Sequence, residues 1–262
     1  RRAFMLSMAT LLLAPSNALS QSQITTTIRF GLTPVFLNDD IQLLTVIKNY
    51  LESATGYTIE LTTRRTYQEV TSLLVSGQLD AAWICGYPFV KFQNELEILA
   101  VPEWNGKPLY QSYLITKSDR KASKLADLKG DIHAFSDPDS NSGYLVTKAL
   151  LQENGLSSDA FFKKALFTYS HRNVIRAVAS GLVQSGSVDG YVWEVMREFD
   201  PGLVASTKIV RKSAWFGFPP IAVSKRFAQT EQVSALRRAF LASRETESGR
   251  AMLDYLRLSG FV

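Results

Sequence analysis

The 262-residue chain has one cysteine, Cys85, and two histidines, His133 and His171. A single cysteine excludes an intrachain disulfide framework and a cysteine-rich metal site. The sequence also has no phosphate-binding Walker loop, no Gly-x-Gly-x-x-Gly turn after a strand, and no metal-ligand spacing. We therefore predict no cofactor.

Dense runs of lysine or arginine are missing as well, although 29 Lys and Arg against 24 Asp and Glu give a formal charge of +5. Without such runs we expect no nucleic-acid partner. The hydrophobic content of 46% and charged content of 20% are those of an ordinary globular protein. A mild positive charge is compatible with a small anionic ligand.

A short apolar run, Met5–Ala14, lies near the start and is too short to span a membrane. Arg1 and Arg2 precede it, and small residues follow at Ala18-Leu19-Ser20. This is the pattern of a secretory signal peptide, of the twin-arginine or the Sec type. We expect residues 1–20 to form the signal peptide, with cleavage near Ser20 and export of the remaining chain to the periplasm.

Apolar periodicity in the first ninety residues predicts strands that alternate with helices, hence a parallel sheet covered on both faces. The expected strands are Thr27–Leu32, Thr58–Thr62 and Asp80–Ile84, and the expected helices begin near Ile41 and Thr66. Further on, the pattern predicts strands or extended segments at Glu97–Val101, Pro108–Thr116, Ile132–Phe135, Ser187–Val192, Ile209–Ser213 and Ile221–Val223. It predicts further helices at Leu125–Gly130, Tyr144–Asn154, Asn173–Ser180, Val233–Ala242 and Ser248–Leu258.

Two such α/β units joined by long strands predict an α/β fold of two lobes, each with a mostly parallel sheet flanked by helices, and a cleft between them. We expect residues 21–115 and 213–262 to form lobe 1 and residues 116–212 to form lobe 2.

Cys85 follows the buried strand Asp80–Ile84 and precedes a helix start at Gly86-Tyr87-Pro88. In open α/β sheets, ligands bind outside the carboxyl ends of strands, where helix N-termini offer free N–H groups. The thiol is therefore either a small buried hydrophobe or a ligand-binding group.

Polar residues mark two further helix starts. Ser140, Asn141 and Ser142 precede one helix, where they would cap it or, with its N–H groups, bind an oxyanion. His171 opens another, as a capping or exposed histidine or as a ligand-binding one.

Asp189 and Glu194 flank an apolar stretch at the end of an expected strand, where they would be solvated, cap a helix, or accept hydrogen bonds from ligand hydroxyls. An enzyme hypothesis pairs Cys85 as nucleophile with His171 as base, in a thiol hydrolase. No local cysteine signature supports it. We therefore predict that the chain is not an enzyme.

Several motifs together resemble the phosphonate-binding (PhnD-like) periplasmic proteins, in the same order and from about Ile28 to the C-terminus. They are Gly31-Leu32-Thr33-Pro34, Ser76–Trp83, Asp137–Val146, His171 with Ala177–Gly181, and Val188-Asp189-Gly190. The resemblance implies a two-lobed, hinge-closing binding protein. It also implies that the ligand is a tetrahedral oxyanion held by Ser, Thr and Asn side chains and by helix N–H groups.

One position departs from the transporter members of that family, which tend to carry a Gly/Pro/Ser-type turn where this chain has Ile84-Cys85-Gly86. The cysteine resembles that of the arsenite-sensing branch, whose members report to a sensor histidine kinase controlling arsenite oxidase. Trivalent arsenic condenses with a thiolate. Asp189 or Glu194 could accept hydrogen bonds from a protonated ligand, whereas they would repel a fully ionised phosphate.

The first hypothesis is thus a periplasmic protein that binds arsenite and signals to a membrane sensor histidine kinase. The alternative is the substrate-binding component of an ABC transporter, working with a permease, for phosphate, phosphite or a phosphonate. Cys85 is the candidate arsenic ligand. The candidate ligand-binding residues are Thr33, Cys85, Gly86, Tyr87, Ser140, Asn141, Ser142, His171, Asp189 and Glu194.

Overall fold

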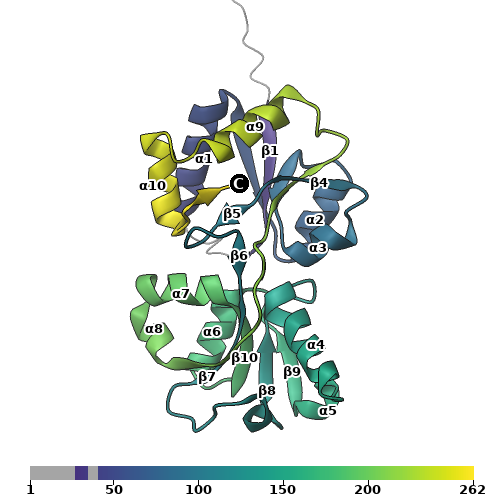
Figure 1. The fold of residues 1–262 in the computed structure, drawn as a ribbon, viewed down its shortest axis with the longest axis vertical. Coiled ribbons are helices and arrows are strands. Elements are labelled where there is room, and N and C mark those ends of the chain that lie inside the picture. The colour runs from purple at the N-terminus through teal and green to yellow at the C-terminus, as the bar shows by residue number, and fades with distance from the viewer. Residues whose placement is uncertain (1–26, 35–40) are drawn as a thin grey trace, which may run out of the picture.

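The computed structural model describes residues 27–34 and 41–262, which form two lobes one above the other (Figure 1). The predicted signal peptide lies outside the described residues. Within them, no helix combines the length and the apolar character that a membrane crossing requires.

The first lobe is built on a five-stranded sheet. Its strands, in spatial order, are β2 (Thr58–Thr63), β1 (Thr27–Leu32), β3 (Ala81–Trp83), β13 (Ile221–Ser224) and β4 (Leu96–Ala100). The pairs β1–β2 and β1–β3 are parallel, whereas β13 runs antiparallel to β3 and to β4. A strand from late in the chain thus completes the sheet begun by the first hundred residues.

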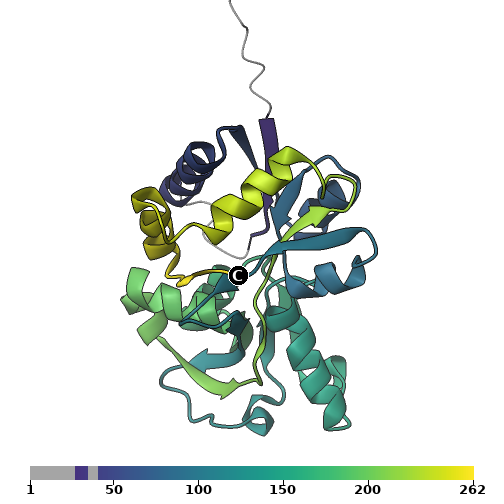
Figure 2. The same ribbon diagram turned by 45° about the horizontal axis from the view of Figure 1, so that its top comes forward.

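Helices cover both faces of this first sheet. They are α1 (Ile41–Thr55), α2 (Tyr67–Val75), α3 (Gly86–Lys91), α9 (Glu231–Leu241) and α10 (Glu247–Leu256). The C-terminal helices α9 and α10 lie beside α1, and the views of Figures 1 and 2 agree on this packing. Val70 and Leu74 of α2 enter a second cluster on the other face. The two clusters bury the sheet on both sides.

The second lobe has a five-stranded sheet of its own. In spatial order its strands are β11 (Thr207–Lys212), β7 (Ser112–Lys117), β10 (Ser185–Asp189), β8 (Ile132–Phe135) and β9 (Lys164–Phe167). Around it lie η1 (Leu125–Leu128), the π-helical turn η2 (Asn141–Leu145), α4 (Val146–Glu153), α5 (Ser158–Phe161), α6 (His171–Ala179), α7 (Gly190–Phe199) and α8 (Pro201–Ala205).

Two chain segments cross between the lobes and pair with each other. The first contains β5 (Pro102–Glu103) and β6 (Leu109–Tyr110), and the second contains β12 (Phe216–Gly217), antiparallel to β6. The C-terminal strand β14 (Gly260–Phe261) pairs with β5. The chain enters the second lobe at about Ser112 and leaves it after Lys212. The predicted boundaries of the lobes stay predictions.

The two-lobed α/β fold is confirmed, but the sheets are mixed rather than mostly parallel. In each, two pairings are parallel and two are antiparallel, because β13 and β7 belong to the segments that cross between the lobes and run opposite to their neighbours. The strand expected over Pro108–Thr116 is two strands, interrupted at Gln111.

The strand predicted at Ser187–Val192 is wrong beyond Asp189, because α7 begins at Gly190. Asp189 caps this helix by accepting the N–H groups of Tyr191 and Val192. The run from Ser187 to Val192 is entirely buried, so its apolar pattern has no polar face to reveal the helical period.

Candidate functional site

The candidate residues gather where strands of both sheets end. Thr33 follows β1, Cys85 follows β3, Asp137 follows β8, and Asp189 is the last residue of β10. Two residues of the first lobe, Tyr67 of α2 and Cys85, form hydrogen bonds with the second lobe. Their partners are Asp137, Asn141 and His171. The carboxyl ends of the two sheets therefore face one another where the lobes meet, and direct hydrogen bonds join them.

Cys85 is buried, with 3% of its surface exposed. It stands at the N-terminus of α3, and its Sγ accepts the backbone N–H of Asn141 from the second lobe at 3.3 Å. Burial raises the pKa of the thiol to about 11, although N–H groups of Asn141, Tyr87 and Gly86 oppose this rise. The thiol is therefore protonated near pH 7.

His171, the first residue of α6, links the lobes through Tyr67. Its Nδ1 accepts the backbone N–H of Asp189 at 3.0 Å, so the ring proton lies on Nε2. Nε2 is 3.1 Å from the Tyr67 hydroxyl, and the assigned tautomer makes Nε2 the donor. Burial lowers the pKa of His171 to about 3, which keeps the ring neutral. The hydroxyl proton of Tyr67 then remains for another acceptor.

Two carboxyl groups are buried in the same region. Burial raises the pKa of Asp189 to about 7, and its Oδ2 accepts the Ser142 hydroxyl at 3.3 Å. Burial also raises the pKa of Asp137, whose oxygens accept the N–H group of Asp139 and that of Tyr67 from the first lobe. Neither aspartate pairs with a lysine or arginine of the described chain.

The Ser140–Ser142 turn is held by contacts of its own. Ser140 accepts the N–H of Gly143 at 3.0 Å, the capping role. The Asn141 side chain donates to the Tyr110 hydroxyl at 3.0 Å, and the Ser142 carbonyl accepts the Ser112 hydroxyl at 2.6 Å. The turn therefore presents the Asn141 N–H directly at the thiol.

Some candidate residues lie elsewhere or are otherwise engaged. Glu194 is not brought to this cluster, because it projects from α7 toward Arg197, Lys212 and the Tyr113 hydroxyl. The Thr33 hydroxyl donates to the Trp83 carbonyl at 3.0 Å. The Tyr87 ring lies beside Lys91, while its backbone N–H belongs to the thiol's surroundings.

The geometry gives no support to a Cys–His nucleophile pair. No hydrogen bond joins Cys85 to His171 among the described residues, and His171 bonds to Asp189 and Tyr67 instead. The other histidine, His133, lies between Ser185 and Ser187 in the core of the second lobe. In the described chain, no three His, Cys, Asp or Glu side chains gather as a metal site.

Sequence reasoning missed three residues of this cluster: Tyr67, Tyr110 and Asp137. In the sequence, Tyr67 is typical of a residue on the buried face of a helix, here α2. Tyr110 is typical of a strand residue. Asp137 lay within a turn-rich segment, and only its contact with the other lobe distinguishes it. The one available signal was the position of Asp137, two residues after the end of a strand.

Comparisons with known proteins identify the family. Residues 30–262 match the family described as ABC transporter, phosphonate, periplasmic substrate-binding protein. The chain belongs to this family of periplasmic substrate-binding proteins, and its members bind substrates rather than transform them. This confirms the family resemblance, the periplasmic location and the expectation of a non-enzyme. Cleavage near Ser20 stays a prediction.

A relative described as a phosphate-import protein PhnD, from Mycolicibacterium smegmatis, is 28% identical over 148 residues. The match covers 52% of this chain and 46% of the relative, so this chain spans about half the length of that relative.

Two solved structures share the fold. A binding protein component of an ABC phosphonate transporter from Pseudomonas aeruginosa has a TM-score of 0.84 at 23% identity, with 90% of this chain and 81% of that chain covered. PhnD1 from Prochlorococcus marinus, in complex with methylphosphonate, has a TM-score of 0.81 at 17% identity, with 90% and 92% covered.

Proposed function

We propose that this protein binds arsenite in the cleft between its lobes and that Cys85 forms a bond to the arsenic. The observation that carries the proposal is the contact between the Cys85 thiol and the Asn141 N–H, which joins the two lobes at 3.3 Å. A ligand bonded to Sγ would therefore meet polar groups of both lobes.

The charge state of the cleft supports a neutral ligand. Arsenous acid is uncharged near pH 7, and its condensation with a protonated thiol gives Cys–S–As(OH)₂ and one water. The thiol proton and one arsenic hydroxyl leave together as that water, so the step creates no charge in a buried site. A thiol with a raised pKa is compatible with this chemistry, and the arsenic supplies the electrophile.

The two remaining arsenic hydroxyls would have both hydrogen-bond acceptors and hydrogen-bond donors within the cluster. Asp189 and Asp137 offer acceptor oxygens, and the Tyr67 hydroxyl and the Asn141 N–H offer donors. A dianionic hydrogen phosphate in the same place would bring one hydrogen and two negative charges to the aspartate oxygens, whereas the arsenic adduct brings two hydrogens and no charge. The cluster thus favours a protonated oxyacid over a dianion.

Calorimetric titration of the purified protein with arsenite, arsenate, phosphate and methylphosphonate tests this proposal. We expect arsenite binding by the wild type and its loss in Cys85→Ser, with circular dichroism confirming that the variant is folded. Equal arsenite affinity in the two proteins would contradict the role of Cys85. Glu194→Gln is a matched control, because Glu194 lies outside the cluster, and it should bind arsenite like the wild type.

The second candidate is the binding component of an ABC transporter for phosphate, phosphite or a phosphonate. It is favoured by the family, by the relative described as a phosphate-import protein and by the shared fold of a methylphosphonate complex. It predicts binding of methylphosphonate or phosphate that survives Cys85→Ser.

For the membrane partner we propose a sensor histidine kinase, with an ABC permease as the alternative. A covalent arsenic–sulfur bond suits a sensor, which responds to occupancy, better than a transporter, which must release its ligand in every cycle. In the source organism, deletion of the gene should abolish arsenite-dependent transcription and leave arsenite uptake unchanged. Loss of uptake with intact transcription would instead support the permease.

A further inference from the structure

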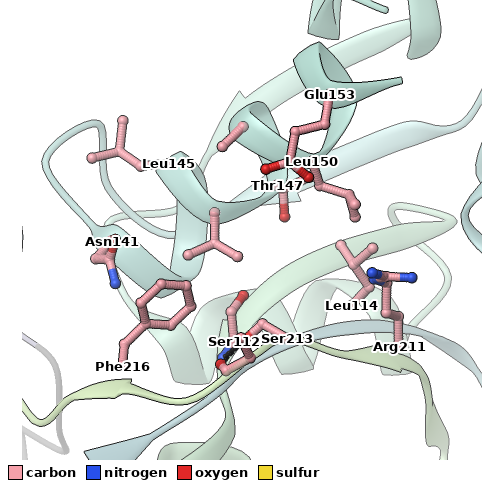
Figure 3. Close-up of a pocket in the computed structure, with 13 residues that line it drawn as sticks. Ser112, Leu114, Asn141, Leu145, Thr147, Leu150, Glu153, Arg211, Ser213 and Phe216 are labelled. Atoms are coloured by element: carbon pink, nitrogen blue, oxygen red, sulfur yellow. Dashed lines mark hydrogen bonds between the residues drawn. The ribbon is translucent and has the colours of Figure 1, made fainter. Parts of the chain in front are cut away.

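A cavity of about 390 Å³ lies in the lower lobe beside the candidate site residues (Figure 3). We call it the α4 groove. One wall of the groove is formed by η2 and α4. The other wall is formed by strands β7 and β11 and by the crossing segment that contains β12. It is lined by Leu114, Leu145, Leu150 and Phe216, among others, with Glu153 and Arg211 at one end. Its size lies within the range of small-molecule pockets.

The groove results from how the second sheet is covered. Side chains alternate along β7, so Tyr113 and Ile115 enter the core beneath α6 and α7, whereas Leu114 enters the cluster beneath α4 and α5. The helices on this second face pack against β8 and β9 at one edge, where Phe135 and Phe167 lie. At the other edge, near β11, apolar surface is left open.

A β-bulge directs an arginine into this space. Ile209 of β11 pairs with Ile115, but Arg211 pairs with Leu114, so Val210 is an extra residue in the strand. In a regular register Val210 would oppose Leu114, and Arg211 would point to the opposite face. Bulges of this kind re-aim side chains.

Two opposite charges stand at the groove without an ion pair. Figure 3 shows Glu153 on α4 and Arg211 on β11 on the two sides of the open space. Neither forms a salt bridge with any residue of the described chain, whereas Arg120 and Asp131 of the same lobe pair at 2.5 Å. The groove therefore offers the Arg211 guanidinium for an anion and the Glu153 carboxylate for a cation. Its remaining lining is largely apolar.

We propose that the α4 groove binds a small zwitterion with an apolar body, namely an α-amino acid with a branched aliphatic or aromatic side chain. Its carboxylate would pair with Arg211, the residue suited to bidentate recognition of carboxylates. Its ammonium group would pair with Glu153, and its side chain would lie against Leu114, Leu150 and Phe216.

The groove shares residues with the cleft. Asn141 lines the groove and also donates its N–H to Cys85, and Ser112 lines the groove and donates to the Ser142 carbonyl. An amino acid in the groove therefore stabilises the arrangement that holds the lobes together. Because coupling between two sites is reciprocal, a ligand in the cleft would in turn raise the affinity of the groove.

Calorimetric titration of the whole protein with L-leucine and L-phenylalanine, in the absence of any oxyanion, tests the proposal. We expect binding by the wild type, a loss of about tenfold or more in Arg211→Gln, the scale of one charge-assisted pair, and a similar loss in Glu153→Gln. Lys208→Gln removes a cation of the same strand outside the groove and should bind like the wild type. Ala149→Trp fills the groove from its exposed rim and should abolish binding.

Absence of binding by both amino acids would overturn the proposal, and so would equal affinity in wild type and Arg211→Gln. Equal binding of 4-methylpentanoate, which lacks the ammonium group, would refute the zwitterion. All of these outcomes are independent of arsenite, so failure here is separate from failure of the proposed function.

Discussion

Burial sets the protonation state of the side chains around Cys85. The same loss of water raises the pKa of Cys85 to about 11 and that of Asp189 to about 7, and lowers that of His171 to about 3. Each shift favours the neutral form of its group. A site of this kind is matched to a ligand that is itself neutral and protonated.

The raised pKa of Asp189 makes stability depend on pH. Its pKa rises from 3.8 to about 7 on folding, so between these values the folded protein holds a proton that the unfolded chain has lost. The free energy of unfolding should therefore fall as pH rises from about 4 to about 7, by at most about 1.4 kcal/mol per pH unit. Asp189→Asn should remove this slope, because asparagine also caps α7 well.

Urea unfolding of the wild type and of Asp189→Asn between pH 4 and pH 8 measures how the free energy of unfolding of each protein depends on pH. His133 and His171, whose pKa values fall from 6.5 to about 3, act in the opposite sense in the lower part of this range. Subtracting the variant's curve removes contributions that the two proteins share. If the two curves run parallel throughout, Asp189 is ionised in the folded protein across this range.

Single residues could be predicted where chemistry and position coincide. Cys85 was a candidate because it is the only thiol and follows a strand, and Asp189 because it ends one. Tyr67 and Tyr110 could not be predicted, since their hydroxyls matter only through partners 104 and 31 positions away in the sequence. Glu194 was placed with Asp189 because a strand was expected, whereas the helix α7 turns it to another face.

Among the elements, η2 packs closely against Ser136, the residue that follows β8, because Gly143 has no side chain. A Cβ on Gly143 would lie 1.8 Å from the Ser136 hydroxyl and 2.8 Å from Cε1 of His171. Gly143→Ala should therefore destabilise the protein by about 1–3 kcal/mol, the cost of overpacking a well-packed site, and should weaken ligand binding by displacing His171.

Gly202→Ala in α8 provides the control, because a Cβ there meets no atom within 4 Å. Alanine is the better helix former, so this variant should be as stable as the wild type or more stable by about 0.5–1 kcal/mol. Urea denaturation compares the two. Equal stability of Gly143→Ala and the wild type would show that η2 can move away from Ser136 and His171.

Helix starts and stops were mostly predictable because they depend on local residues. Thr66 and Glu69 form a capping box at α2, and Gly77 follows its end with φ +78°. The mixed direction of the strands was not predictable, since it depends on which late segment returns to which sheet. The bulge at Val210 likewise depends on pairing with β7.

At the scale of the whole molecule, three hydrogen bonds between described residues join the lobes at the candidate site. Asp137 accepts the Tyr67 N–H, His171 meets the Tyr67 hydroxyl, and Asn141 donates to Cys85. Two of the three involve Tyr67, so the start of α2 is the main bridge in this set. The two lobes themselves were predictable from the two α/β units, whereas this bridge was not.

Tyr67→Phe removes the hydroxyl and leaves the backbone bridge intact. Loss of one hydrogen bond of about 1 kcal/mol between the lobes should weaken arsenite binding about fivefold and shift the ligand-free protein toward open forms. Calorimetry measures the affinity, and the radius of gyration from small-angle scattering measures the opening.

Tyr50→Phe is the matched control, since the Tyr50 hydroxyl donates to the Ala239 carbonyl within the first lobe. It should lower stability by a similar amount and leave arsenite affinity and the radius of gyration unchanged. Equal effects of the two variants on affinity would mean that the bridge through Tyr67 has no special part in closure.

The measurement that tests the central claim most directly is X-ray absorption at the arsenic edge of the arsenite-loaded protein. The proposed Cys–S–As(OH)₂ adduct predicts one sulfur and two oxygen neighbours around arsenic, with the sulfur lost in Cys85→Ser. An arsenic surrounded by oxygen alone in the wild type would contradict a bond to Cys85. The cleft would then be an ordinary oxyanion site, and Cys85 a residue of its packing.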